Sequence, residues 1–127
     1  MHTKNDNSIN SFIGNSTYFS GDIETDGPIR IDGKFKGRII SSGMVYLGRK
    51  SLSECKIFAR DVIIGGTIKG DIYSENSLKV LKSAEIIGNI YSSTIQMDDG
   101  VIFDGECRIL SKEEMKSLID KRKIERI

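Results

Sequence analysis

The sequence is short of the residues that metal and acid–base chemistry most often need. Its 127 residues include one histidine, two cysteines and no tryptophan. The histidine is His2, in a polar segment at the start of the sequence, and none occurs after it. A zinc site built on three histidines is therefore excluded, and the body of the chain has no histidine to act as a general base. We expect no catalytic residue, no metal site and no cofactor.

Charge of one sign and long apolar runs are also missing, and we expect no secretory leader. The 19 Lys and Arg residues balance 18 Asp and Glu residues, so bulk charge does not favour nucleic-acid binding. No apolar run approaches the ~18 residues of a membrane span, and residues 1–10 lack the apolar core of a secretory signal. No Walker-type phosphate loop occurs, so we expect no nucleotide. The expected location is the cytoplasm, where both cysteines would be free thiols.

Glycine and β-branched residues are abundant, and they fall into a repeated pattern. The 13 glycines with one proline are typical of strands broken by tight corners. The form apolar-x-Gly-x-apolar occurs as FSGDI at 19–23, FKGRI at 35–39, IKGDI at 68–72 and IIGNI at 86–90. Two weaker copies, SECKI at 53–57 and FDGEC at 103–107, fill the gaps. The last positions of the copies recur at steps of 16, 18, 15, 18 and 17 residues: Ile23, Ile39, Ile57, Ile72, Ile90 and Cys107.

A second set of short segments lies between these copies and has the same period. The segments are IRI at 29–31, VYL at 45–47, VII at 62–64, LKV at 78–80 and IQM at 95–97. Their third members are spaced by 16, 17, 16 and 17 residues: Ile31, Leu47, Ile64, Val80 and Met97. Two independent sets of positions thus share a period of about 17 residues, which indicates a structural repeat.

The repeat predicts an all-β fold, a single-domain parallel β-helix of about six coils. Within each copy, apolar or small residues alternate with charged ones, which is the period of a strand with one buried face. Strands recurring at a period below twenty residues are typical of a solenoid with one turn of chain per repeat. We expect two core columns, formed by Ile39, Ile57, Ile72 and Ile90 and by Leu47, Ile64, Val80 and Met97. The spacing alone leaves the handedness open.

The middle position of the repeat is expected to face a narrow interior that a larger side chain would overfill. Cys55 occupies that position in the third coil, and Cys107 occupies an apolar position in the sixth. Three coils would separate them, well beyond the ~7 Å limit on the Cα separation of a disulfide. We expect both to be buried structural thiols.

The two ends of the chain differ from the repeat. Residues 1–18 are expected to form a flexible tail, residues 19–110 the β-helix, and residues 111–127 a short amphipathic helix. Ser111 and Glu114 have the spacing of a capping box, and apolar side chains follow on one helical face: Met115, Leu118 and Ile119. Phe12 and Ile13 are predicted either to cover the open end of the solenoid or to touch a membrane surface.

The terminal coils carry the candidate functional residues. A β-helix has open strand edges at both ends, and soluble monomers cover them with polar or charged caps. Here no long capping sequence is evident. Uncovered coils favour stacking of one molecule on another, which makes a filament. The candidate polymerisation residues are Phe19 and Ile23 in the first coil and Phe103, Cys107, Ile109 and Leu110 in the last.

The same residues resemble a known family. The stretch FIGNSTYFSGDIETDGPIRIDGKFKGRI, continued by GTIKGDI and AEIIGNI, resembles the bactofilins, which are bacterial polymer-forming cytoskeletal proteins. The resemblance covers residues 12 to about 110. It implies a right-handed parallel β-helix of triangular section that polymerises with itself, without nucleotide, into filaments that scaffold cell shape, division or cell-wall enzymes. Implied further partners are the inner face of the cytoplasmic membrane and proteins of cell-wall synthesis or morphogenesis, although the short membrane-binding motif of many members is reduced here to MHTK.

Two alternatives remain open at the level of the sequence. One is a small left-handed β-helix enzyme, similar to hexapeptide acyltransferases or to a carbonic anhydrase, which the absence of histidine in the coils disfavours. The other is a monomeric scaffold that binds a partner along one face of the coils.

Overall fold

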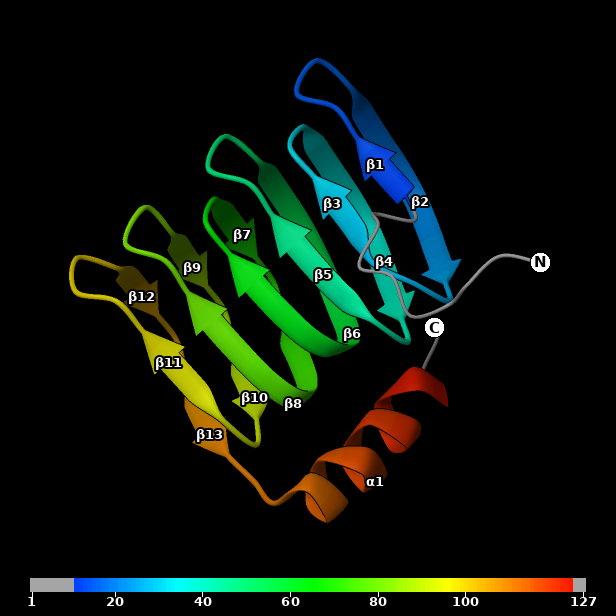
Figure 1. Cartoon of the computed structure of the whole chain (residues 1–127), viewed down its shortest axis with the longest axis vertical. Helices are drawn as coiled ribbons and strands as arrows, with labels where there is room; N and C mark the ends of the chain where they lie inside the picture. Colours follow the sequence, from blue (N-terminus) through cyan, green and yellow to red (C-terminus); the bar gives the residue numbers. More distant parts are fainter. Residues whose placement is uncertain (1–10, 125–127) are drawn as a thin grey trace.

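The computed structural model describes residues 11–124, so residues 1–10 of the predicted tail at 1–18 and residues 125–127 of the predicted C-terminal helix lie outside the described residues. The chain forms six coils of a parallel β-solenoid followed by one helix, α1 (Lys112–Ile124). Figure 1 shows the coils in order from β1 and β2 at one end to β13 at the other, with α1 along one side. This confirms the fold class that the repeat predicts.

Every coil contributes one strand segment to each of three faces, here called A, B and C. Face A consists of β1 (Ser11–Ile13), β3 (Ile29–Ile31), β5 (Met44–Leu47), the end of β6 (Leu52–Ile64), the end of β8 (Ile72–Val80) and β11 (Ile95–Met97). Face B consists of the beginnings of β2 (Tyr18–Thr25), β4 (Lys34–Ser41) and β6, then β7 (Thr67–Lys69), β9 (Glu85–Ile87) and β12 (Ile102–Asp104). Face C consists of the ends of β2 and β4, the middle of β6, the beginning of β8, β10 (Ile90–Ser92) and β13 (Cys107–Ile109).

Both sets of periodic residues lie in register inside the solenoid. On face C, one column runs through Ile23, Ile39, Ile57, Ile72, Ile90 and Cys107. On face A, another runs through Ile13, Ile31, Leu47, Ile64, Val80 and Met97. The members in the middle coils are fully buried, and each contributes about 1.5–3 kcal/mol to stability. The columns therefore hold neighbouring coils together, as one coil alone has no second layer to pack on.

The position of Met97 in the core column needs a correction. The side chain is 39% exposed, because it belongs to the last coil and no seventh coil covers it. The start of the solenoid also differs from the predicted boundary. β1 begins at Ser11 and pairs with β3, so residues 11–13 belong to the first coil and not to a tail.

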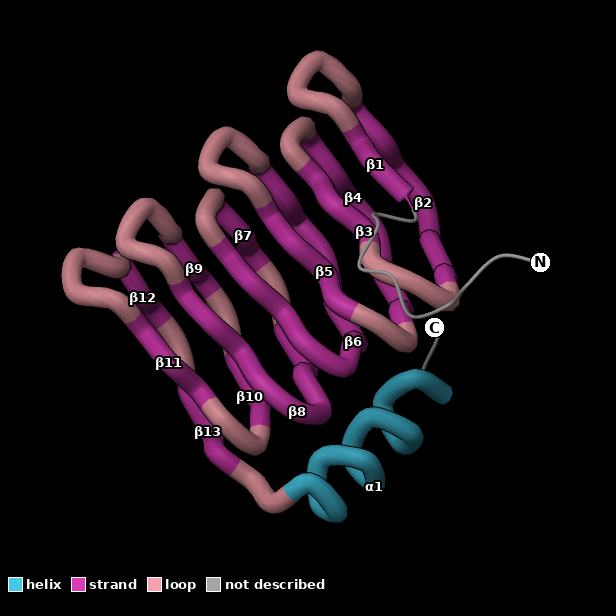
Figure 2. Tube along the Cα trace, viewed as in Figure 1, coloured by secondary structure: helices cyan, strands magenta, loops and turns pink. Residues whose placement is uncertain are grey.

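Turn length accounts for most of the variation of the repeat between 15 and 18 residues. Between faces A and B, the turns at 32–33 and 65–66 have two residues, whereas those at 14–17, 48–51, 81–84 and 98–101 have four. The longer turns project from the body of the solenoid in Figure 2. The strands keep their register because the extra residues are accommodated outside the ladder.

The repeated glycines have a different role from the one expected. Gly37, at the corner between faces B and C, has a φ angle of 143°, and a Cβ atom there would overlap the carbonyl oxygen of Gly21 in the coil before it. The constraint is thus the backbone of the neighbouring coil and not the volume of the interior. Cys55 takes the same corner, and no non-glycine residue among those described has a positive φ angle. Its thiol is buried, which raises its pKa to about 12.

The C-terminal helix begins with a complete capping box. The Ser111 backbone N–H donates to Glu114 Oε1 at 3.0 Å, and the Glu114 backbone N–H donates to Ser111 Oγ at 3.1 Å. Met115 and Ile119 are buried against Phe58 and Tyr73 on the outer surface of face C. The helix is therefore docked on the solenoid and turns back along its side.

Asp61 joins two coils at the corner between faces C and A. Its Oδ1 accepts hydrogen bonds from Asn76 Nδ2 at 2.9 Å and from Ser77 Oγ at 2.7 Å, and its Oδ2 accepts one from Arg60 Nε at 2.9 Å. Burial alone would raise the pKa of Asp61, but the hydrogen bonds from Ser77, Arg60 and Asn76 together outweigh it and lower the pKa below its usual value. The ionised carboxylate is thus the form that the fold stabilises.

We expect Asp61→Asn to destabilise the subunit by about 1–3 kcal/mol near pH 7, the range for losing hydrogen bonds to a charged group. A lowered folded-state pKa gives stability that is present above the unfolded-state value, about 3.9, and is lost as the pH falls through the folded-state value. The difference between variant and wild type should therefore shrink on acidification from pH 7 to pH 3. Urea unfolding of dilute protein measures it, with Asp99→Asn, in an exposed turn, as the control. A difference independent of pH would contradict this role.

Candidate assembly surfaces at the ends of the solenoid

Within residues 11–124, no strand or helix covers the apolar side chains and the outer strand edges of the last coil. Phe103, Cys107 and Ile109 hold the interior positions of this coil, in register with residues of the coil before it. Ile109 is 65% exposed and Ile102, on the outer surface of face B, is 60% exposed. These side chains and the free edges of β11, β12 and β13 form what we call the C-terminal end surface.

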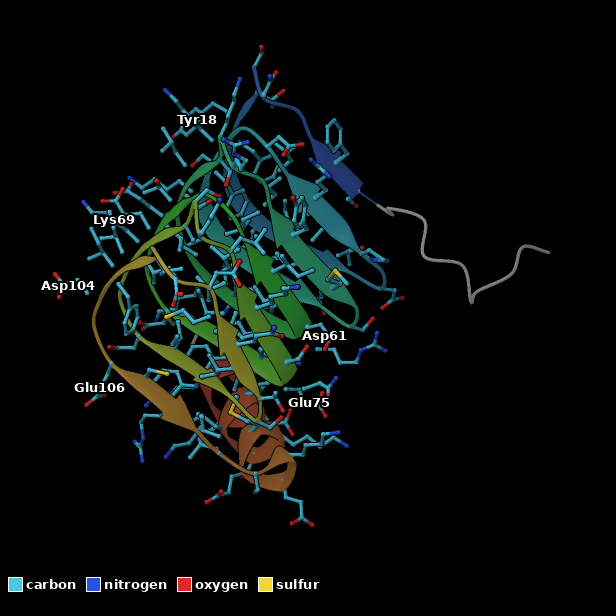
Figure 3. All side chains as sticks on the ribbon, turned by 60° about the vertical axis from the view of Figure 1, so that its left-hand side comes forward. Tyr18, Asp61, Lys69, Glu75, Asp104 and Glu106 are labelled. Carbon is cyan, nitrogen blue, oxygen red and sulfur yellow. The ribbon has the colours of Figure 1, made fainter. Side chains whose placement is uncertain are left out.

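The first coil also carries partly exposed apolar side chains, at the opposite end of the solenoid. Phe19 and Ile23 are half-buried and pack against the solenoid core from the first coil. The Phe19 ring stacks on Phe35 of the next coil, with centroids 5.5 Å apart and planes 12° apart. In Figure 3, Tyr18 lies near this end, whereas Asp104 and Glu106 lie near the other. Among the described residues, β1 pairs with β3 alone and β2 with β4 alone, and the other edges of β1 and β2 complete the N-terminal end surface.

Three further predicted contact residues, one for polymerisation and two for an end cover or a membrane, have different environments: Leu110, Phe12 and Ile13. Leu110 packs with the cluster between α1 and face C, because the chain turns back along the side of the solenoid directly after β13. Ile13, predicted either to cover the open end or to touch a membrane surface, faces inward and is 8% exposed, so it is part of the core of the first coil. Phe12, its neighbour, is 60% exposed and points to the outer surface of face A, not across the end.

The course of α1 leaves the last coil open. The helix contacts β8 and β10, and its two most buried side chains pack on the aromatic rings of face C. A helix placed across β11, β12 and β13 would have capped the end. The free edges and the exposed apolar side chains therefore remain available to another molecule.

Cys107 is not the buried thiol that the repeat predicted. It is exposed in the last coil, where no further coil packs on it, although partial burial of the thiol still raises its pKa.

We expect maleimide to label Cys107 in the dispersed subunit and to label it much more slowly after assembly. Cys55, with a pKa of about 12 and a buried side chain, should stay unlabelled in both states. Equal labelling of Cys107 before and after assembly would remove it from the contact.

The described residues contain neither a candidate metal site nor a candidate membrane-spanning helix. Within residues 11–124, no three His, Cys, Asp or Glu side chains lie close enough to share a metal ion. In the same part of the chain, no helix is both long and apolar enough to cross a bilayer.

The fold places the chain among parallel β-solenoid proteins, here with exposed apolar side chains in the last coil. The family model of bactofilins, described as polymer-forming cytoskeletal proteins, matches residues 11–108. The chain belongs to this family.

Individual relatives are similar over most of the solenoid. Bactofilin BacO of Myxococcus xanthus (strain DK1622) is 28% identical over 104 residues, which is 82% of each chain. Bactofilin BacP of the same organism is 21% identical over 96 residues, 76% of this chain and 40% of BacP. A chain from a cryo-EM reconstruction of Thermus thermophilus bactofilin double helical filaments superposes with a TM-score of 0.64 at 25% identity, covering 76% of this chain and 96% of that one.

One surface, the aromatic column on face C, is not predicted by the sequence patterns described above. Phe58, Tyr73 and Tyr91 stack on one another outside the solenoid. Each directly follows a core isoleucine of the repeat, at Ile57, Ile72 and Ile90. The aromatic residues therefore have the same period as the core isoleucines, but this period does not predict which column on the outer surface is covered by a helix.

Proposed function

We propose that this chain is a structural subunit that stacks end to end, without nucleotide, into filaments. The observation that carries the proposal is that both terminal coils present interior apolar residues and free strand edges, while α1 leaves the last coil uncovered. Membership of a polymer-forming family supports it.

The driving force is the burial of apolar side chains, which also holds neighbouring coils together inside the subunit. A junction that covers four apolar side chains gains about 6–12 kcal/mol at 1.5–3 kcal/mol each. Association opposes this with an estimated 4–15 kcal/mol of lost freedom and ordering. Hydrogen bonds between the free strand edges add to the favourable side. Because the favourable and opposing terms are of the same order, we expect the contact to form without chemical energy from a nucleotide.

The filament acts as a scaffold for cell shape, division or the positioning of cell-wall enzymes. Membership of the family supports this scaffold role, and so does the filament surface, on which every subunit would present the same side chains. The T. thermophilus relative is described as double helical filaments, and two strands that wind together need a lateral contact as well as an end contact. For this chain the proposal covers the end contact alone, and we expect the assembly in the cytoplasm, next to the inner membrane face.

Negative-stain electron microscopy of the purified chain in nucleotide-free buffer tests this function. Filaments are expected, and their number should not change when nucleotide is added. Discrete particles at high protein concentration would contradict end-to-end assembly and would favour a monomeric scaffold that binds a partner along one face.

A further inference from the structure

The outer surface of face C carries an apolar column that the solenoid does not need for its core. Phe58 and Tyr73 stack with centroids 4.8 Å apart and planes 6° apart, and Tyr73 and Tyr91 stack at 4.9 Å and 5°. Ile40 extends the column by one coil. Glu24 and Arg108 hold the same position in the first and last coils. The column is thus an apolar stripe across four coils, with a charge at each end.

This column forms a cluster separate from the core, and α1 covers it. Met115 is fully buried and Ile119 is 8% exposed, and both pack with Phe58 and Tyr73. Only Leu110 and Ser111 connect the helix to β13. Isolated helices shorter than ~12–15 residues are marginal in water, and α1 has 13 residues. Its position therefore depends on a few contacts with the column.

The cover is also incomplete. A hollow of about 240 Å³ lies between α1 and the coils. Its apolar walls come from Ile40 and Phe58 on face C and from Ile119 on the helix, and Lys116 and Lys123 line its α1 side. The Ile40 end of the column is therefore accessible beside the helix, where a competing surface can begin to displace it.

We propose that α1 is a displaceable cover, and that the column beneath it is the surface through which a second copy of this chain, in a neighbouring filament, packs laterally. The inference rests on the proposed function, because end-to-end stacking would repeat the column along the filament. The columns of two subunits can pack against one another, because in both of them the aromatic rings repeat at the spacing of neighbouring strands.

Multivalency explains why the occupant is a filament of the same chain. One column of four side chains is too small to offset the loss of freedom when two monomers associate. Many columns on one rigid filament act together, because each contact after the first forms at a high effective concentration. A docked α1 on every subunit would keep filaments single, and its release would pair them.

Met115→Asp tests the cover, because a charge at this buried position should release α1 and leave the separate solenoid core intact. Ser117→Asp adds the same charge at an exposed position of the same helix and is the matched control. We expect Met115→Asp filaments to pair side by side, so that the mass per unit length doubles in electron microscopy, and Ser117→Asp filaments to resemble wild type. Ile119→Asp should repeat the effect of Met115→Asp if that variant loses its fold by circular dichroism.

A second substitution identifies the surface. Adding Tyr91→Glu to Met115→Asp places a charge in the column and should restore single filaments. Single filaments of Met115→Asp, wild-type filaments that are already paired to the same extent, or pairing that persists with Tyr91→Glu would each overturn the inference. A folded Met115→Asp variant that forms no filaments would overturn it as well, because the cluster would then belong to the end contact. Failure of the wild type to polymerise would instead disprove the proposed function.

Discussion

Phe103→Arg is expected to abolish filament formation while the subunit stays folded. Phe103 is the last member of a face B column that includes Phe35, Ile68 and Ile86, and it faces the C-terminal end surface. In the dispersed subunit an arginine at this edge keeps its charge in water. In a junction it would be buried without a partner, which costs several kcal/mol. That penalty is comparable to the whole net gain of the contact, so assembly should be lost rather than weakened.

Leu52→Arg is the matched control for this prediction. Leu52 is 48% exposed and lies on the outer surface of face B in a middle coil, so the same change of an apolar residue to arginine leaves both ends intact. Lys36→Glu, also exposed on face B, tests a change of charge. Sedimentation and electron microscopy should find Phe103→Arg in the supernatant as discrete particles and both controls as filaments. If Phe103→Arg polymerises as well as Leu52→Arg, the C-terminal end surface is assigned incorrectly.

Most of the fold could be predicted from the sequence, because a solenoid requires equivalent residues to recur once in every coil. Ile39, Ile57 and Ile72 must stand in one column, so their spacing records the coil length directly. The helix is equally evident, because its capping box and its apolar face are local signals.

What the sequence does not record is where an element docks and what remains exposed. Met97 and Cys107 have the pattern of core residues, yet they are exposed because they belong to the last coil. Leu110 is an apolar residue directly after the last strand, which predicts a place on the C-terminal end surface, but it packs with the cluster between α1 and face C. The direction in which a chain leaves its last coil depends on long-range packing, here on the column of Phe58, Tyr73 and Tyr91, and no local pattern specifies it.

The glycine corners connect the fold to the assembly, and Gly37→Ala is expected to have the largest effect on stability. At a φ angle of 143° an L side chain is strained, and its Cβ would overlap the Gly21 carbonyl oxygen of the first coil. Backbone of a neighbouring coil cannot yield as the end of a flexible side chain can. We expect a loss of about 3 kcal/mol or more, the upper part of the range for strained backbone positions.

Gly14→Ala provides the control, since its Cβ would meet only Phe12 and Thr17 side-chain atoms at 3.6 and 4.0 Å, and its effect should stay within about 0.5 kcal/mol. Because coils in a solenoid contact only their neighbours, the damage from Gly37→Ala should first detach the coil that holds Phe19 and Ile23. Hydrogen exchange should then be faster in residues 11–25 than in the later coils, and filament formation should fail together with the N-terminal end surface. Uniform exchange along the chain, or a thermal midpoint equal to that of Gly14→Ala, would mean that the close approach of the two backbones at this corner does not limit the fold.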